Sequence, residues 1–151
     1  MSDAIKHECG IGRIRLLKPL DYYQEKYGSA LWGLNKMYLL MEKQRNRGQD
    51  GAGLVSVKLN VKPGRRYMFR KRNNESSPWT KLFAEVDQEL SEFNKANPAD
   101  HSEAEVLKQG FPFAGEVLMG HLRYGTHGEY DISHCHPVIR NSEYQNRSLA
   151  L

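Results

Sequence analysis

Cys9 is the residue best able to do covalent chemistry in this chain of 151 residues. It follows a charged leader and precedes Gly10 and Ile11, which begin a strand-like run. A thiol acts as a nucleophile when a neighbouring base takes its proton and a substrate carbonyl is held beside it. The competing interpretation is a small buried hydrophobic residue, the common role of a free cysteine. The function of Cys9 therefore depends on which groups the fold brings to it.

Two arginine-containing segments are candidates to serve this thiol. Residues 45–53 (RNRGQDGAG) break a helical pattern near Arg47, and residues 120–128 (GHLRYGTHG) carry an apolar strand to its end at Arg123. Both segments also have plain structural interpretations. Gly48 would be the left-handed cap of a helix, and the second segment a strand end with capping polar groups. An arginine that ends an apolar strand needs a partner, which favours a binding role for Arg123. For Arg47, a surface ion pair is an equal alternative.

The composition is that of one soluble globular domain, with 39% hydrophobic and 26% charged residues. The sequence has no apolar run of about eighteen residues that would predict a membrane span. Charged side chains throughout the first twenty residues exclude a secretory signal. We therefore expect a cytoplasmic protein without a membrane partner. The two cysteines, Cys9 and Cys135, are too few for a disulfide framework or a four-thiolate metal site.

The net charge of +4 is concentrated in residues 62–72, which contain no acidic residue. Tyr67 and Phe69 are interleaved with the basic residues, so a ribbon on which nucleic-acid bases stack is one interpretation. No nucleic-acid-binding motif accompanies the run. We favour a basic edge strand with its loop, because exposed positive charge discourages edge-to-edge pairing. No nucleic-acid partner is expected.

Three histidines, His127, His134 and His136, crowd the loop that follows Arg123. Imidazole is a common zinc ligand, but the spacing of these three matches no common ligand pattern. We interpret them as part of a solvated loop. The sequence therefore predicts neither a metal site nor a bound cofactor in this chain.

The periodicity of apolar residues predicts short strands and two amphipathic helices. Strands are expected at residues 10–17, 54–59, 66–70 and 115–123, with a further strand beginning at residue 148. Helices are expected at residues 30–44, capped by Ser29, and at residues 79–93, capped by Ser76-Ser77-Pro78. The connections are expected to be a polar segment (21–27), a surface excursion with a short helix (94–105) and a long loop (124–136). This mixture predicts an α+β fold with the helices outside the sheet.

Three motifs in this order resemble the N-terminal nucleophile glutamine amidotransferases. They are residues 9–11 (CGI), 47–53 (RGQDGAG) and 120–126 (GHLRYGT). Within that group, Gln49, Tyr124 and His136-Pro137 are similar to the amidophosphoribosyltransferase branch, whereas His127-Gly128 is more similar to the glucosamine-6-phosphate synthase branch. The resemblance spans nearly the whole chain.

The resemblance implies a four-layer α/β/β/α sandwich of mostly antiparallel sheets. It also implies that residues 1–8 are a leader and that residues 9–151 are the N-terminal portion of the glutaminase domain. Removal of the leader would expose the α-amino group of Cys9 as the base for its own thiol. Cys9 would then attack the side-chain amide of glutamine, release ammonia and leave a glutamyl thioester for water to hydrolyse.

Substrate-binding roles carry over motif by motif. Arg123 would pair with the α-carboxylate of glutamine, a task suited to the two parallel donors of a guanidinium group. Thr126 and the backbone near His127 would complete that cradle, and Arg47 would brace the nucleophile strand and the loop over the site. The family's oxyanion donors and the Asp for the amino group of the substrate would lie beyond Leu151. The chain alone is therefore expected to hydrolyse glutamine weakly or not at all, because one lost oxyanion donor costs about a hundred- to thousandfold in rate.

The resemblance also implies the rest of the parent enzyme. A C-terminal phosphoribosyltransferase domain, with its Mg²⁺, would use the ammonia to aminate phosphoribosyl pyrophosphate in purine synthesis, and the full-length enzyme would be a homo-oligomer. The alternatives are another acceptor, such as a sugar phosphate, or a non-catalytic module. Arg13 supports the second alternative, because a charge in a central strand is costly to bury.

Overall fold

The computed structural model describes residues 8–100, 103–125 and 131–139. These residues form one four-stranded sheet in which every paired neighbour is antiparallel, together with four α-helices and two short 3₁₀ segments. The predicted α+β class is confirmed. Among the described residues, no helix is long and apolar enough to cross a membrane. The strand predicted from residue 148 lies outside the described residues.

The strands follow the order β1-β4-β2-β3, so a segment late in the chain occupies the middle of the sheet. Their bounds are Gly10–Arg15 for β1, Gly51–Val57 for β2, Met68–Asn73 for β3 and Val117–Arg123 for β4. The predicted strands at 10–17 and 115–123 correspond to β1 and β4. The prediction at 54–59 was misplaced, because β2 begins three residues earlier, at glycines that carry no apolar signal. The prediction at 66–70 was misplaced as well, because β3 begins at Met68 and continues to Asn73.

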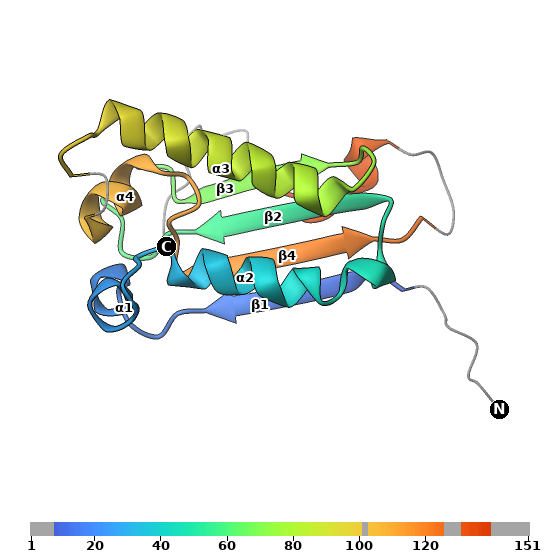
Figure 1. Cartoon of the computed structure of the whole chain (residues 1–151), viewed down its shortest axis with the longest axis horizontal. Coiled ribbons are helices and arrows are strands. Elements are labelled where there is room, and N and C mark those ends of the chain that lie inside the picture. Colours follow the sequence, from blue (N-terminus) through green and yellow to red (C-terminus); the bar gives the residue numbers. More distant parts are fainter. Residues whose placement is uncertain (1–7, 101–102, 126–130, 140–151) are drawn as a thin grey trace.

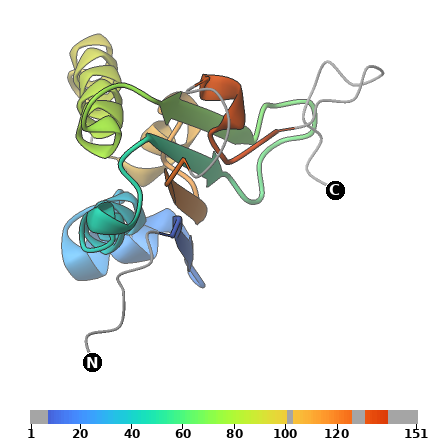
Figure 2. The ribbon, with the colours of Figure 1, turned by 90° about the vertical axis from the view of Figure 1, so that its right-hand side faces the viewer.

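Helices α2 (Trp32–Glu42) and α3 (Pro78–Ala96) cover one face of the sheet (Figures 1 and 2). Helix α2 packs on β1 and β4, and α3 on β2 and β3. Glycines at positions 12 and 120 leave room for the fully buried Met41 of α2. Leu82, Phe83 and Val86 of α3 are buried at helical spacing, as predicted. The main core therefore lies between this helical layer and the sheet.

Helix α1 (Leu20–Tyr27) corrects the predicted polar connector at residues 21–27. Tyr23 and Tyr27 stack on Trp32, with ring centroids 5.3 and 5.0 Å from its ring, and Leu20 is buried. Gly28 ends the helix with a positive φ of 77°. Packing of these rings overrides the polar composition, and Gly28 was a helix-stop signal in the sequence. The short helix predicted within residues 94–105 was misplaced, because α4 (Ala104–Gly110), which contacts α1, begins only at the end of that segment.

The two predicted serine caps are wrong. Ser29 Oγ accepts a hydrogen bond from the backbone N–H of Leu31 at 3.2 Å, and α2 begins only after this turn, at Trp32. Ser77 has a φ of 56° and makes no side-chain capping bond, although Pro78 occupies the first turn of α3 as predicted. In both places the serine shapes the turn that leads into the helix.

Strand β3 is an edge strand, as predicted from its basic residues. Its charges are nevertheless not all exposed to solvent. Lys71 makes ion pairs with Glu85 (3.2 Å) and Glu89 of α3. Arg70 and Arg72 donate to backbone carbonyls of residues 133–137. The basic residues of β3 therefore bind α3 on one face of the sheet and the segment 133–137 on the other.

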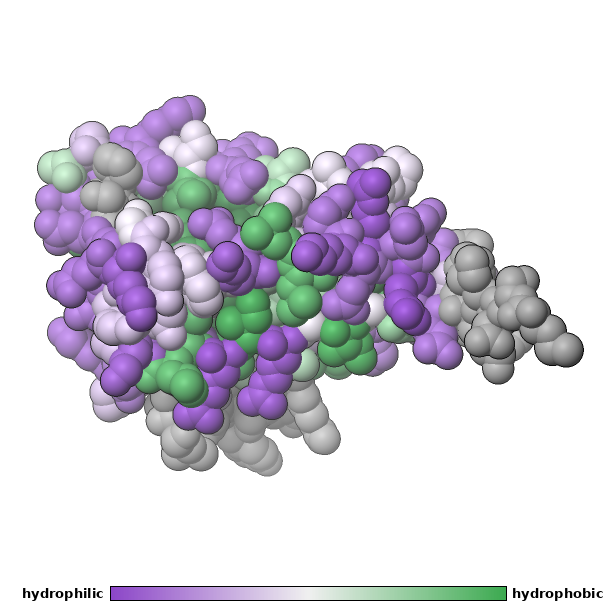
Figure 3. Space-filling view, turned by 60° about the horizontal axis from the view of Figure 1, so that its bottom comes forward, coloured by the Kyte–Doolittle hydropathy of each residue, from purple (hydrophilic) through white to green (hydrophobic). Residues whose placement is uncertain are grey.

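The face opposite the helices is only partly covered. The segment 131–139, which contains the 3₁₀ turn Ile132–His134, lies against β2 there. Ile11 of β1 is 65% exposed and Met119 of β4 is 39% exposed. Along the β1 edge of the sheet, which is the side seen in Figure 3, apolar residues form a band between hydrophilic ones. The described residues therefore build two layers, and the four-layer sandwich is not confirmed.

Arg13 lies on β1 and is exposed. The sequence interpretation placed it in a central strand, where its charge would be costly to bury. Among the described residues β1 is an outer strand, and Arg13, paired with Met119, lies on the face away from α2, where it is exposed.

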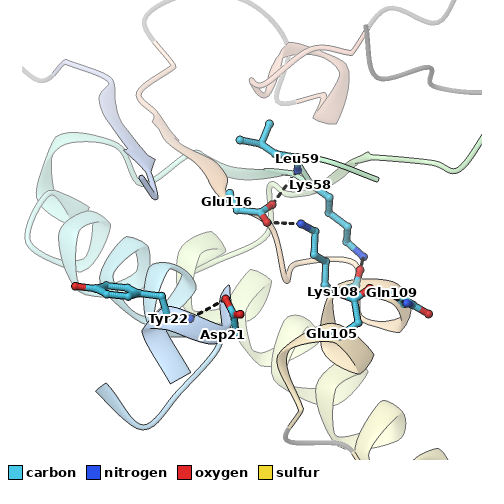
Figure 4. Close-up of polar contacts among 8 residues, drawn as sticks. All are labelled: Asp21, Tyr22, Lys58, Leu59, Glu105, Lys108, Gln109 and Glu116. Atoms are coloured by element: carbon cyan, nitrogen blue, oxygen red, sulfur yellow. Dashed lines mark hydrogen bonds and ion pairs between the residues drawn. The ribbon is translucent and has the colours of Figure 1, made fainter. Parts of the chain in front are cut away.

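A buried charge network ties α4 to the end of the sheet far from Cys9 (Figure 4). Lys108 pairs with Glu116, and Glu116 Oε2 also accepts from the N–H of Leu59 at 2.8 Å. Lys58 is 3% exposed and donates to the Lys108 carbonyl at 2.6 Å. Burial lowers the pKa of Lys58 to about 8, with Lys108 acting in the same direction and Glu116 opposing it.

The Lys58 site predicts a pH-dependent stability. Between pH 8 and 10.5 the unfolded chain binds a proton that folded Lys58 has released, so stability should rise with pH across this window. Lys58→Met should remove up to about 3 kcal/mol of that rise. Urea unfolding of both proteins at pH 7.5 and 10 measures the difference. Lys62→Met, at an exposed position, is the control; equal slopes for Lys58→Met and wild type would contradict the assignment.

Candidate active site at the Cys9 end of the sheet

Cys9 immediately precedes β1 and is exposed. Its Sγ lies 3.5 Å from the backbone N of Tyr124, which donates to the sulfur, and 3.9 Å from the Tyr124 carbonyl oxygen. The interpretation of Cys9 as a buried hydrophobic residue is therefore wrong. Cys135, with no exposed surface, plays that role instead. The pairing of β1 with β4 brings the thiol beside the residue that follows Arg123.

The segment 47–53 braces this end of β4 through Asp50. The N–H of Asp50 donates to the Arg123 carbonyl at 3.0 Å, and Asp50 Oδ2 accepts from the N–H of Gly125 at 2.8 Å. Sequence reasoning assigned no role to Asp50. The signal was its acidic side chain beside a strand start, where Asp commonly accepts backbone N–H bonds.

Gly48 is extended, with φ −153° and ψ 116°, so the left-handed cap suggested for it is wrong. A Cβ at this position would lie 2.6 Å from the backbone of Leu122. Glycine is required because the loop after the 3₁₀ turn Arg45–Arg47 crosses directly over β4. The arginine loop and the nucleophile strand are therefore both fixed to β4.

The predicted substrate-binding residues divide into three cases. Arg123 is 7% exposed and its Nη1 donates to the Asp131 carbonyl at 3.5 Å, so its guanidinium group is held within the protein. Arg47 is exposed, and within the described residues its side chain forms no hydrogen bond or ion pair. Thr126 and His127 lie outside the described residues. The structure thus brings Cys9 and Arg123 to one end of the sheet.

The segment 131–137 packs directly against the backbone of β2, because the β2 residues that it covers are glycines without side chains. A Cβ at Gly51 would overlap Cys135 Sγ, and a Cβ at Gly53 would overlap the His136 carbonyl oxygen. Strand residues two apart point to the same face, so both glycines form one flat strip. This spacing was visible in the sequence, and a close backbone approach is its usual meaning.

Gly53→Ala is expected to destabilise the protein by about 3 kcal/mol, because its methyl group would meet backbone that has no flexible end to move. Gly10→Ala is the control within another strand. Its Cβ would meet the flexible Gln44 side chain at 3.3 Å, so a small effect is expected. Chemical unfolding measures both variants. Equal stabilities for the two would show that the loop is not seated on β2.

His121 is 8% exposed on β4, and no group in the described part of the chain accepts from or donates to its Nδ1. Burial, with smaller contributions from His136 and Arg123, lowers the pKa of His121 to about 4. The His136 ring lies 5.1 Å away in an edge-to-face arrangement. His121 is therefore neutral at pH 7 and accepts a proton there only weakly, which makes it a poor general base for a thiol.

Metal binding was predicted to be absent from this chain. The described residues contain no group of three or more His, Cys, Asp or Glu side chains placed to hold a metal ion. His134 and His136 belong to the segment on β2, whereas His127 lies outside the described residues.

A scan against protein-family models, a search of curated proteins and a search of solved structures each find no match for this chain.

Proposed function

We propose that this chain carries the glutaminase half of a glutamine amidotransferase, with Cys9 as the nucleophile. The observation that supports it best is the meeting of an exposed thiol, the Tyr124 backbone and the buried Arg123 at one end of the β1–β4 pair. These three groups come from two of the three motifs that carry the sequence resemblance. Asp50, from the third motif, braces the same end.

The proposed reaction begins with hydrolytic loss of residues 1–8, which leaves Cys9 with a free α-amino group. That amine takes the thiol proton, and Sγ forms a bond to the side-chain carbonyl carbon of glutamine. The C–N bond then breaks, the nitrogen takes the proton from the ammonium group, and ammonia leaves. Water hydrolyses the thioester to glutamate and restores the thiol.

The electrostatics of the site favour the amine as the base. An α-amino group has a pKa of about 7.7–8.0, close to the working pH of a cytoplasmic enzyme. His121 has its pKa lowered to about 4 by burial and so competes poorly for the thiol proton. This difference supports a mechanism in which Cys9 supplies both the nucleophile and its base.

Glutamine would be recognised through its α-carboxylate by Arg123, with Thr126, His127 and Arg47 as further contacts. Arg123 Nη1 donates to the Asp131 carbonyl at 3.5 Å, and this bond restrains the orientation of the guanidinium group. In the proposed four-layer sandwich, a second sheet would cover the partly exposed face that carries Ile11 and Met119. In the parent enzyme, the ammonia would pass to phosphoribosyl pyrophosphate in a separate domain of a cytoplasmic homo-oligomer.

A protection experiment on the chain processed at the Glu8–Cys9 bond tests this function. Iodoacetamide alkylates the exposed Cys9, and bound glutamine should slow that reaction. Asparagine, one methylene shorter, should not protect at the same concentration. Equal alkylation rates with glutamine, asparagine and no ligand would overturn the proposal.

A further inference from the structure

We propose that Arg72, assisted by Arg70, is a positioning residue that sets the orientation of Arg123 by clamping the segment 131–137 onto β2. This inference rests on the proposed binding of the glutamine carboxylate by Arg123. The two clamping residues lie in the basic run of β3, to which the proposed reaction gives no role.

Arg72 makes the central contacts. Its Nη1 donates to the Cys135 carbonyl at 2.9 Å and to the Ser133 carbonyl at 3.3 Å. Arg70 adds a bond from Nη1 to the Pro137 carbonyl at 3.4 Å. All three acceptors are backbone atoms, so the clamp fixes the path of the segment whatever its side chains are.

The position of the clamp follows from the sheet register. Arg72 pairs with Gly53 and Arg70 with Val55, and both arginines lie on the face away from α3. Gly51 and Gly53 have no side chains with which to hold the segment that covers them. The guanidinium groups of the neighbouring strand supply the missing donors. Burial, with a smaller contribution from the neighbouring Arg72, lowers the pKa of Arg70, so two cations share this face.

The segment transmits this restraint to Arg123 through a short, stiff turn. Asp131 accepts from the N–H of Ser133 at 3.2 Å and from its hydroxyl at 2.5 Å. Within the turn, the N–H of Cys135 donates to the Ile132 carbonyl at 3.0 Å. The Asp131 carbonyl then accepts from Arg123 Nη1. A single residue, Ile132, therefore separates the clamped Ser133 from Asp131, whose carbonyl accepts from the proposed substrate-binding arginine.

The test compares two chloroketone analogues of glutamine, one with a free α-carboxylate and one with a methyl ester in its place. Both alkylate Cys9 of the processed chain with loss of chloride, and the ratio of their rate constants measures carboxylate recognition. Arg72→Gln should lower this ratio about tenfold, because a mobile segment no longer holds Arg123. Arg72→Lys should be intermediate, because it keeps a cationic donor but carries it on a flexible stem without the planar guanidinium group.

Arg65→Gln, at an exposed position of the same basic run, is the matched control and should leave the ratio unchanged. Hydrogen exchange at residues 132–137, measured on the same proteins, should rise in Arg72→Gln and stay at the wild-type level in Arg65→Gln. If Arg72→Gln fails to fold, Arg70→Gln serves in its place with a smaller expected loss. A ratio in the folded clamp variants equal to that of Arg65→Gln would overturn the inference. A wild-type ratio near one would instead overturn the role of Arg123, so the two failures are distinguishable.

Discussion

Replacing Cys9 with serine in the processed chain is expected to abolish its labelling by the chloroketone analogue of glutamine. Loss of a catalytic nucleophile typically costs on the order of a thousandfold or more. A serine hydroxyl at this position would have to lose a proton that it holds far more tightly than a thiol does. Intact mass spectrometry of the labelled protein measures the fraction modified as a function of time.

Cys135→Ser is the matched control for this experiment, because Cys135 is the other cysteine and has no exposed surface. It should label at the wild-type rate. The unprocessed chain, with Glu8 still joined to Cys9, should label slowly although its thiol is exposed. Its Cys9 nitrogen is an amide and cannot act as a base. Fast labelling of Cys135, or of the unprocessed chain, would contradict the proposed mechanism.

Arg123→Gln is expected to weaken binding of the carboxylate-bearing analogue about a hundredfold, which corresponds to about 2.7 kcal/mol and to the loss of a bidentate, charge-assisted pair. Labelling by the methyl ester should change little. Arg123→Lys keeps the charge but loses the planar fork, so its loss should be smaller, about tenfold. The concentration dependence of the labelling rate separates binding from the alkylation step.

Arg13→Gln is the control for Arg123→Gln, because it removes a positive charge from an exposed position on β1. It should leave both analogues unaffected. Arg123 is buried and hydrogen-bonded, so thermal unfolding must show that its variants remain folded. A folded Arg123→Gln protein that still prefers the carboxylate would show that another group recognises it.

Much of the fold could be predicted because apolar periodicity reports directly on burial. It located α3, with Leu82 and Val86 at helical spacing, and β4 as a buried strand. It failed at α1, where three aromatic rings stack in a segment of polar composition. It also failed at the start of β2, because Gly51 and Gly53 carry no side chain to alternate. In each case tertiary contacts decided the structure.

The candidate site was predictable in its parts and not in its connections. Cys9 and Arg123 were identified from residue type and motif, and the pairing of β1 with β4 brings their segments together. The bracing by Asp50 and the clamp by Arg72 join residues 75 and 63 positions apart, and no local pattern reveals such contacts.

The central claim is that Cys9, once it is the first residue, forms a thioester with glutamine. The most direct measurement mixes the processed chain with glutamine, quenches in acid and determines the mass of the peptide that contains Cys9. We predict a gain equal to glutamine less ammonia, found only on Cys9, absent in Cys9→Ser and absent with asparagine. One turnover suffices for the adduct to be detected, so a slow reaction does not prevent the measurement. No gain in mass on Cys9 after prolonged incubation, in a protein shown to be folded, would contradict the proposed function.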